Sequence, residues 1–71
     1  MDADQLINHS IKLFLRKSNQ QPSASESYIR TEGGKDYVVL KNANGVLAVY
    51  SISDDDYLKQ LKNIPDWVDK E

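Results

Sequence analysis

Few side chains in this sequence have the type and spacing that catalysis requires. His9 is the only histidine, and the chain contains no cysteine. A catalytic base must lie within hydrogen-bond reach of a reacting group. Ser10 follows His9 directly in a predicted helix, where adjacent residues do not face each other. We therefore predict that the protein is not an enzyme, that it has no catalytic residues, and that His9 lies on the solvent side or at the boundary of its helix.

The run Asp54-Asp55-Asp56 carries the carboxylates that a divalent cation prefers. An EF-hand loop, however, needs oxygen ligands at alternating positions over about twelve residues and a closing glutamate. The sequence lacks that spacing, whereas acidic residues at the start of a helix are stabilised by the macrodipole. We therefore predict a helix N-terminus here, no metal site and no cofactor. Gly33-Gly34 is not followed by the Lys-Ser/Thr pair of a phosphate loop, so it predicts a turn.

Aromatic and basic residues form the one constellation that suggests a function. We predict that they share one face of a sheet and that this face binds a protein partner or a second copy of the chain, because aromatic patches tend to mark interfaces. Two alternatives remain: stacking of single-stranded nucleic-acid bases with cations near the phosphates, and a plain solvated face, since tyrosine is favoured in strands. The predicted binding residues are Tyr28, Arg30, Tyr37, Lys41, Tyr50 and Trp67.

The face assignment depends on two hairpins. Asn44-Gly45 lies between β-branched and aromatic runs and predicts a two-residue turn that needs positive φ. Gly33-Gly34 predicts a second such turn. The first turn pairs Leu40 with Val49, Val39 with Tyr50, Val38 with Ser51 and Tyr37 with Ile52. The second pairs Glu32 with Lys35, Thr31 with Asp36, Arg30 with Tyr37, Ile29 with Val38 and Tyr28 with Val39.

Side chains alternate across a strand, so these registers sort the strands into two faces. The aliphatic face is the predicted core and the tyrosine-bearing face is predicted to be open. The core face carries Ile29, Thr31, Val38, Leu40, Leu47, Val49 and Ser51, and the open face carries Tyr28, Arg30, Tyr37, Val39, Lys41, Ala48, Tyr50 and Ile52.

The remaining segments complete a small α+β domain over residues 1–71. Residues 1–18 predict an amphipathic helix capped by Asp2 or Asp4, with apolar residues at helical spacing. Ser53, with Asp56 three positions later, predicts the capped start of a second helix. The predicted order is α-β-β-β-α, with both helices on one face of a three-stranded antiparallel meander. The segments are 1–18 helix, 19–25 linker, 26–52 meander, 53–64 helix and 65–71 tail, with Trp67 packing back on the domain.

The composition of the chain argues against nucleic-acid binding, membrane insertion and secretion. The 71 residues carry a formal net charge of −2 with a pI of about 5.2, which disfavours binding to a phosphate backbone. Mean hydropathy is −0.62, and no apolar run approaches the roughly 20 residues of a membrane span. The acidic start, MDADQ, lacks the pattern of a signal peptide. We therefore expect a cytoplasmic protein that does not contact membranes.

Two resemblances accompany these predictions. The predicted α-β-β-β-α order is similar to that of double-stranded RNA-binding domains, but Asp54-Asp55-Asp56 stands where that family carries basic residues, so its activity is not carried over. The run from Tyr37 to Tyr50, then Leu58-Lys59 and Pro65, resembles small uncharacterised cyanobacterial proteins. This second resemblance covers about the last half of the chain and implies no particular chemistry.

Overall fold

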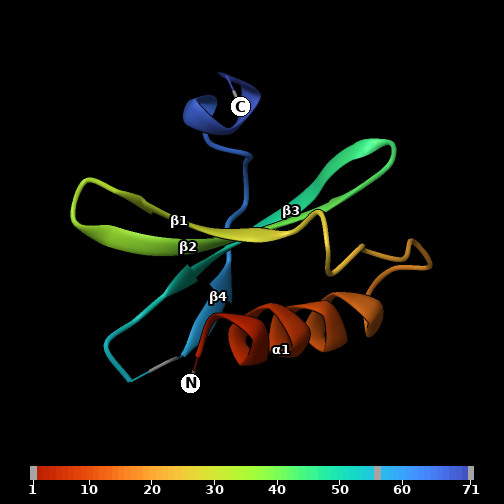
Figure 1. Cartoon of the computed structure of the whole chain (residues 1–71), viewed down its shortest axis with the longest axis horizontal. Helices are drawn as coiled ribbons and strands as arrows, with labels where there is room; N and C mark the ends of the chain where they lie inside the picture. Colours follow the sequence, from red (N-terminus) through yellow and green to blue (C-terminus); the bar gives the residue numbers. More distant parts are fainter. Residues whose placement is uncertain (1, 56, 71) are drawn as a thin grey trace.

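The computed structural model describes residues 2–55 and 57–70. It shows one α-helix packed against a four-stranded antiparallel sheet, with a 3-10 helix on the opposite side (Figure 1). The strands follow the order β1-β2-β3-β4 across the sheet. The elements are α1 (Ala3–Leu15), β1 (Tyr28–Glu32), β2 (Lys35–Asn42), β3 (Gly45–Ile52), β4 (Leu58–Gln60) and η1 (Asp66–Lys70).

The first helix begins as the sequence predicts. The carboxylate of Asp2 accepts the backbone N–H of Gln5 at 2.9 Å, and the Gln5 side chain accepts the N–H of Asp2 at 3.1 Å. This reciprocal capping box satisfies two donors that have no partner within a helix. α1 ends at Leu15, three residues before the predicted limit. Its buried side is made of Leu6, Ile7, Ser10 and Phe14.

The segment between α1 and the sheet is tied to the end of β2. The backbone N–H of Ser23 donates to the carbonyl of Lys41 at 2.7 Å. The hydroxyl of Ser27 accepts the N–H of Lys41 at 3.1 Å and donates to the carbonyl of Ser23 at 2.8 Å. The second half of the predicted linker therefore brings the chain directly from α1 onto β1.

The register of β1 and β2 is confirmed. Tyr28 pairs with Val39, and the pairing continues without interruption to Glu32 and Lys35. Gly33 and Gly34 take φ values of 58° and 80°, which glycine adopts without steric cost. These two glycines therefore occupy the turn positions that the sequence predicts.

The register of β2 and β3 differs from the prediction by one residue over most of its length. Asn42 pairs with Gly45, so the turn is centred on Ala43-Asn44, and the register shifts between Leu40 and Lys41. The Asn42 side chain accepts the N–H of Asn44 at 2.9 Å, a local bond that competes with the predicted turn. Beyond the shift, Leu40 pairs with Ala48, Val39 with Val49 and Val38 with Tyr50.

A one-residue difference moves every side chain of β3 to the other face. The predicted faces are therefore right for β1 and β2 but wrong for β3 beyond its irregularity. Ala48 and Tyr50 face α1, whereas Val49 faces away from it.

The predicted helix over residues 53–64 is wrong, because the chain makes a turn and a fourth strand there. The carboxylate of Asp55 accepts the hydroxyl of Ser53 at 2.5 Å and the N–H of Tyr57 at 3.3 Å. The backbone N–H of Ser53 also donates to the carbonyl of Tyr57 at 3.0 Å, which closes the turn. Asp56, the other residue of the predicted cap, lies outside the described residues.

The sheet separates two apolar clusters. α1 covers one face, and the segment from Leu61 to Val68 covers the other, so the two helical segments lie on opposite faces and not on one (Figure 1). The helix-side cluster contains Leu6, Ile7, Phe14, Val38, Leu40, Ala48, Tyr50 and Leu58. The second cluster contains Val39, Val49 and Val68, with Tyr28, Tyr37, Val46, Leu61 and Trp67 packed around them.

Within the described part of the chain, neither helical element has the length and apolar character needed to cross a membrane.

Replacing Leu40 tests the packing of the helix-side cluster. Leu40 is fully buried, and Leu40→Ala removes apolar contacts and leaves a cavity, so it should lower the free energy of unfolding by about 2–5 kcal/mol. Leu15→Ala is the matched control, because Leu15 is 40% exposed and its loss should change stability by about 0.5 kcal/mol or less. Urea denaturation followed by circular dichroism measures both, and equal effects would contradict the described packing.

The β3–β4 turn predicts a specific pH dependence. Hydrogen bonds from the Ser53 hydroxyl and the Tyr57 backbone lower the pKa of Asp55, so this interaction stabilises the fold above the ordinary aspartate pKa and is lost as pH falls through the lowered value. Ser53→Ala should raise the pKa of Asp55 toward its ordinary value, as measured by NMR titration of the side-chain carboxyl. An unchanged pKa would show that the hydroxyl does not hold the carboxylate.

Candidate functional site

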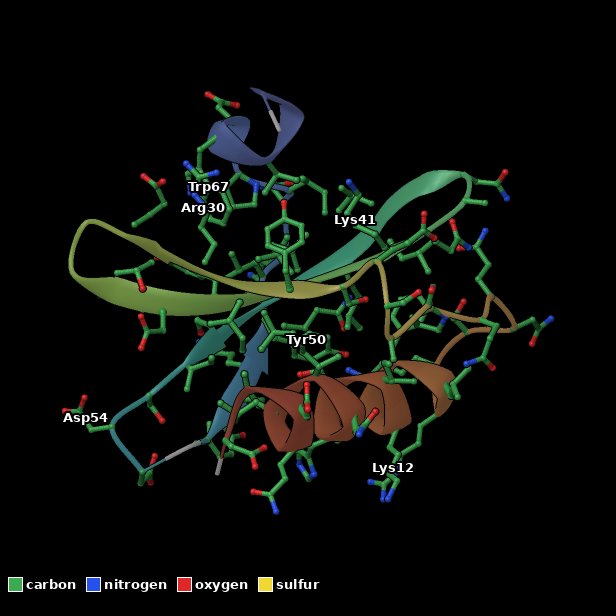
Figure 2. All side chains as sticks on the ribbon, viewed as in Figure 1. Lys12, Arg30, Lys41, Tyr50, Asp54 and Trp67 are labelled. Atoms are coloured by element: carbon green, nitrogen blue, oxygen red, sulfur yellow. The ribbon has the colours of Figure 1, made fainter. Side chains whose placement is uncertain are left out.

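The structure brings together five of the six predicted binding residues. Arg30, Lys41 and Trp67 lie on the side of the sheet that faces away from α1, whereas Tyr50 lies between the sheet and α1 (Figure 2). We call the five residues on the outer side the aromatic face. They are Tyr28, Arg30, Tyr37, Lys41 and Trp67.

Tyr50 is a correction to the predicted site. The irregular pairing near the β2–β3 turn places it in the helix-side cluster, where it is only 3% exposed. Its hydroxyl is buried and has no hydrogen-bond partner among the described residues. Burial also raises its pKa, so the hydroxyl keeps its proton. Tyr50 therefore belongs to the core and not to the aromatic face.

Trp67 contacts two other residues of the aromatic face, Tyr37 and Arg30. Its ring lies 5.3 Å from the ring of Tyr37, centroid to centroid, at a tilt of 51°. The guanidinium carbon of Arg30 lies 5.3 Å from the Trp67 ring centroid, within the range of a cation–π contact. Strand alternation explains the arrangement, because Arg30 and Tyr37 are paired across β1 and β2 and point to the same side. Trp67 reaches them from η1.

Glu32 adds an acidic group that the sequence-based face did not include. It lies two residues after Arg30 on β1, so both side chains point to one side of the sheet. Its carboxylate accepts the Arg30 Nε–H at 2.8 Å and lies 2.6 Å from the second guanidinium nitrogen. Lys35, the cross-strand neighbour of Glu32, is the only charged partner that the predicted register gives to this residue. Glu32 lies two residues after Arg30 in the same strand, and this spacing is the sequence signal for the Arg30–Glu32 ion pair.

Lys41 and Tyr28 form a second contact on this face. The ammonium nitrogen of Lys41 lies 5.8 Å from the centroid of the Tyr28 ring. The Tyr28 hydroxyl is buried and has no hydrogen-bond partner among the described residues. Burial raises the pKa of Tyr28, and the nearby charge of Arg30 opposes part of that rise. The hydroxyl therefore keeps its proton, and because protein atoms cover it, it is not open to a bound group.

The floor of the aromatic face was only partly predicted. Val39 was expected on this side, but Val49 was expected in the core and Val68 was not assigned. Leu61 also packs here, while Leu58 packs on the other face. Residues three apart in a strand point to opposite faces of the sheet, so this placement is typical of a strand. The spacing of Leu58 and Leu61 also fits a helix, which is why the fourth strand was missed.

The aromatic face combines aromatic rings with charged groups. It offers three aromatic rings, two cations and one carboxylate, all held by a small apolar floor. Among the described residues there is no group of three or more histidine, cysteine or acidic side chains placed to hold a metal ion. The arrangement suits contacts with apolar or aromatic groups that carry a negative charge.

Comparison with known proteins finds no matching family model, no matching curated protein and no matching solved structure.

Substitution of Trp67 tests whether η1 is part of the packed structure. Trp67→Ala removes a half-buried ring from Tyr37 and Arg30 and should lower the free energy of unfolding by about 2 kcal/mol. Tyr57→Ala is the control, because Tyr57 is 66% exposed and should have little effect. Because Trp67 is the only tryptophan, unfolding should be followed by circular dichroism. An effect of Trp67→Ala no larger than that of Tyr57→Ala would place η1 away from the sheet.

Proposed function

We propose that this protein is a small non-catalytic binding domain that recognises another protein through the aromatic face. The observation that carries the proposal is the pair of aromatic–cation contacts on one side of the sheet, Arg30 with Trp67 and Lys41 with Tyr28. All of these side chains are half-buried, so each keeps part of its surface accessible while neighbours hold its position.

The residue types support a protein partner. Tryptophan, tyrosine and arginine are the residues that most often dominate the energetics of protein interfaces. Here their side chains are already fixed by contacts within the fold, which lowers the conformational entropy lost on binding. A preformed patch of this kind binds without a large change of shape.

The charges of the face define the partner more closely. Glu32 pairs with Arg30, whereas Lys41 makes no ion pair with any described residue. A carboxylate next to an apolar side chain would meet Lys41 and the ring of Tyr28 together. The acidic Glu32 and the net charge of −2 disfavour a phosphate backbone in the same place.

The test of this proposal begins with a displayed peptide library, from which peptides that bind the wild-type protein are selected. Their binding is measured by the emission of Trp67, the only tryptophan. Lys41→Glu should weaken the selected peptides by about tenfold or more, because it reverses a charge that borders the contact. Lys12→Glu is the matched control, since Lys12 lies on α1 and points away from the sheet (Figure 2), and it should leave affinity unchanged.

Chemical-shift mapping then decides between the alternatives. Shifts confined to Tyr28, Tyr37, Lys41 and Trp67 are the expected result. Selected peptides that bind both lysine variants equally, or that shift α1 instead, would rule the aromatic face out. Binding of mixed single-stranded oligonucleotides, with an affinity that falls steeply with salt, would replace a protein partner with a nucleic acid. Sedimentation of the free protein shows whether a second copy is the partner.

A further inference from the structure

A second surface lies along the β4 edge of the sheet. The sheet order leaves β4 with a single neighbour, β3. The residues that flank β4 direct their backbone groups to the β3 side: the carbonyl of Tyr57 accepts a hydrogen bond at 3.0 Å and the N–H of Leu61 donates one at 2.9 Å. Because these groups alternate along an antiparallel strand, Leu58 and Gln60 point theirs away from β3. The outer edge of β4 therefore presents donors and acceptors to any strand that approaches it.

A groove of about 380 Å³ lies between this edge and the C-terminal half of α1. Leu13 of α1 lines it together with Arg16 and Lys17, which follow the helix, and Tyr50 lines it from β3, beside residues of β4. The volume falls in the range of sites that bury a ligand. The groove is on the α1 side of the sheet, so it is separate from the aromatic face.

The groove is positively charged on its α1 side. Arg16 and Lys17 make no ion pair with any described residue. A carboxylate that enters the groove therefore meets two cations that no acidic side chain of the described chain neutralises. Charge-assisted hydrogen bonds of this kind are among the stronger polar contacts in proteins.

Tyr50 forms part of the inner wall of the groove. Its hydroxyl is buried and has no hydrogen-bond partner in the described chain. Because protein atoms cover this hydroxyl, it is not open to a ligand in the groove, and binding there depends on the cations and the strand edge.

We propose that this groove binds an extended acidic segment of another protein, which joins the sheet as a fifth strand beside β4. Backbone hydrogen bonds to Leu58 and Gln60 hold the segment, and alternate side chains enter the groove. Apolar side chains contact Leu13 and Leu58, while a carboxylate meets Arg16 and Lys17.

The short length of β4 and the charge of Lys59 limit unspecific pairing of the edge. An added strand therefore depends on the groove and its cations for affinity. This dependence favours an acidic sequence over a basic or purely apolar one.

The first experiment uses two probes on the full chain, an acetylated peptide that alternates valine with glutamate and one that alternates valine with lysine. The glutamate peptide should bind, and it should slow amide hydrogen exchange at Leu58 and Gln60 by about tenfold or more, because their N–H groups become donors to the peptide. Exchange at Lys59, whose N–H points to β3, should not change. Binding without slower exchange at Leu58 and Gln60 would overturn the strand model.

The second experiment compares backbone and side-chain variants. Gln60→Pro removes the outward N–H and leaves the β3 pairing intact, since proline is tolerated on edge strands. Gln60→Ala keeps the N–H and is the matched control. Affinity for the glutamate peptide should fall about tenfold or more in Gln60→Pro and less than about twofold in Gln60→Ala. Equal affinities would refute pairing at this edge.

The charge requirement has its own control. The double change Arg16→Gln and Lys17→Gln should weaken the glutamate peptide by about tenfold. Lys12→Gln, on the outer side of α1, should have no effect (Figure 2). Binding of inorganic phosphate or adenosine monophosphate at Arg16, with no binding of either peptide, would identify a small-anion site and overturn the proposal. None of these outcomes depends on Lys41 or Trp67. A negative result here therefore leaves the proposed binding at the aromatic face untouched, and a negative result there leaves this groove untouched.

Discussion

The pairing of β2 with β3 determines which side chains face α1. Asn42 holds the turn one residue earlier than Asn44-Gly45 would, and the register then shifts between Leu40 and Lys41. As a result Val49 lies beside Val39 on the second face, and Tyr50 turns toward α1. Side chains alternate along a strand, so this local feature decides the composition of both clusters.

The second face is completed by residues that are distant in sequence from the strands they cover. Trp67 and Val68 come from η1, yet they contact Tyr37, Arg30 and the valines of β2 and β3. A chain of 71 residues buries only about 60% of its unfolded surface, so two thin layers of this kind contribute much of the available core. The fold therefore places its only tryptophan where part of the ring packs on Tyr37 and Arg30 and part stays exposed.

The sequence predicted the parts of the fold that depend on local signals. The Asp2 cap, the helix that follows it, the Gly33-Gly34 turn and the β1–β2 register all follow from residue type and spacing. The facing of the β3 side chains and the presence of β4 could not be predicted in this way. In each case two local structures, two turn positions or a strand and a helix, both fit the sequence. Asn42 competes with Asn44-Gly45 for the turn. Likewise, Asp55 closes a turn in a segment whose Leu58 and Leu61 also have helical spacing. The same reasons explain the outcome for the site. The β1 and β2 residues lie on the predicted face and Trp67 packs on the domain, whereas Tyr50 lies on the opposite face because the β3 register differs from the prediction.

The position of η1 has a consequence for folding during synthesis. α1 and the two hairpins are complete once Ile52 has been made, and the helix-side cluster then lacks only Leu58. The second cluster cannot close until Val68 has left the ribosome, because that residue supplies one of its three buried side chains. Until η1 docks, Val39 and Val49 lack the side chain that covers them, so a partly folded chain is open to aggregation or to a chaperone at this face.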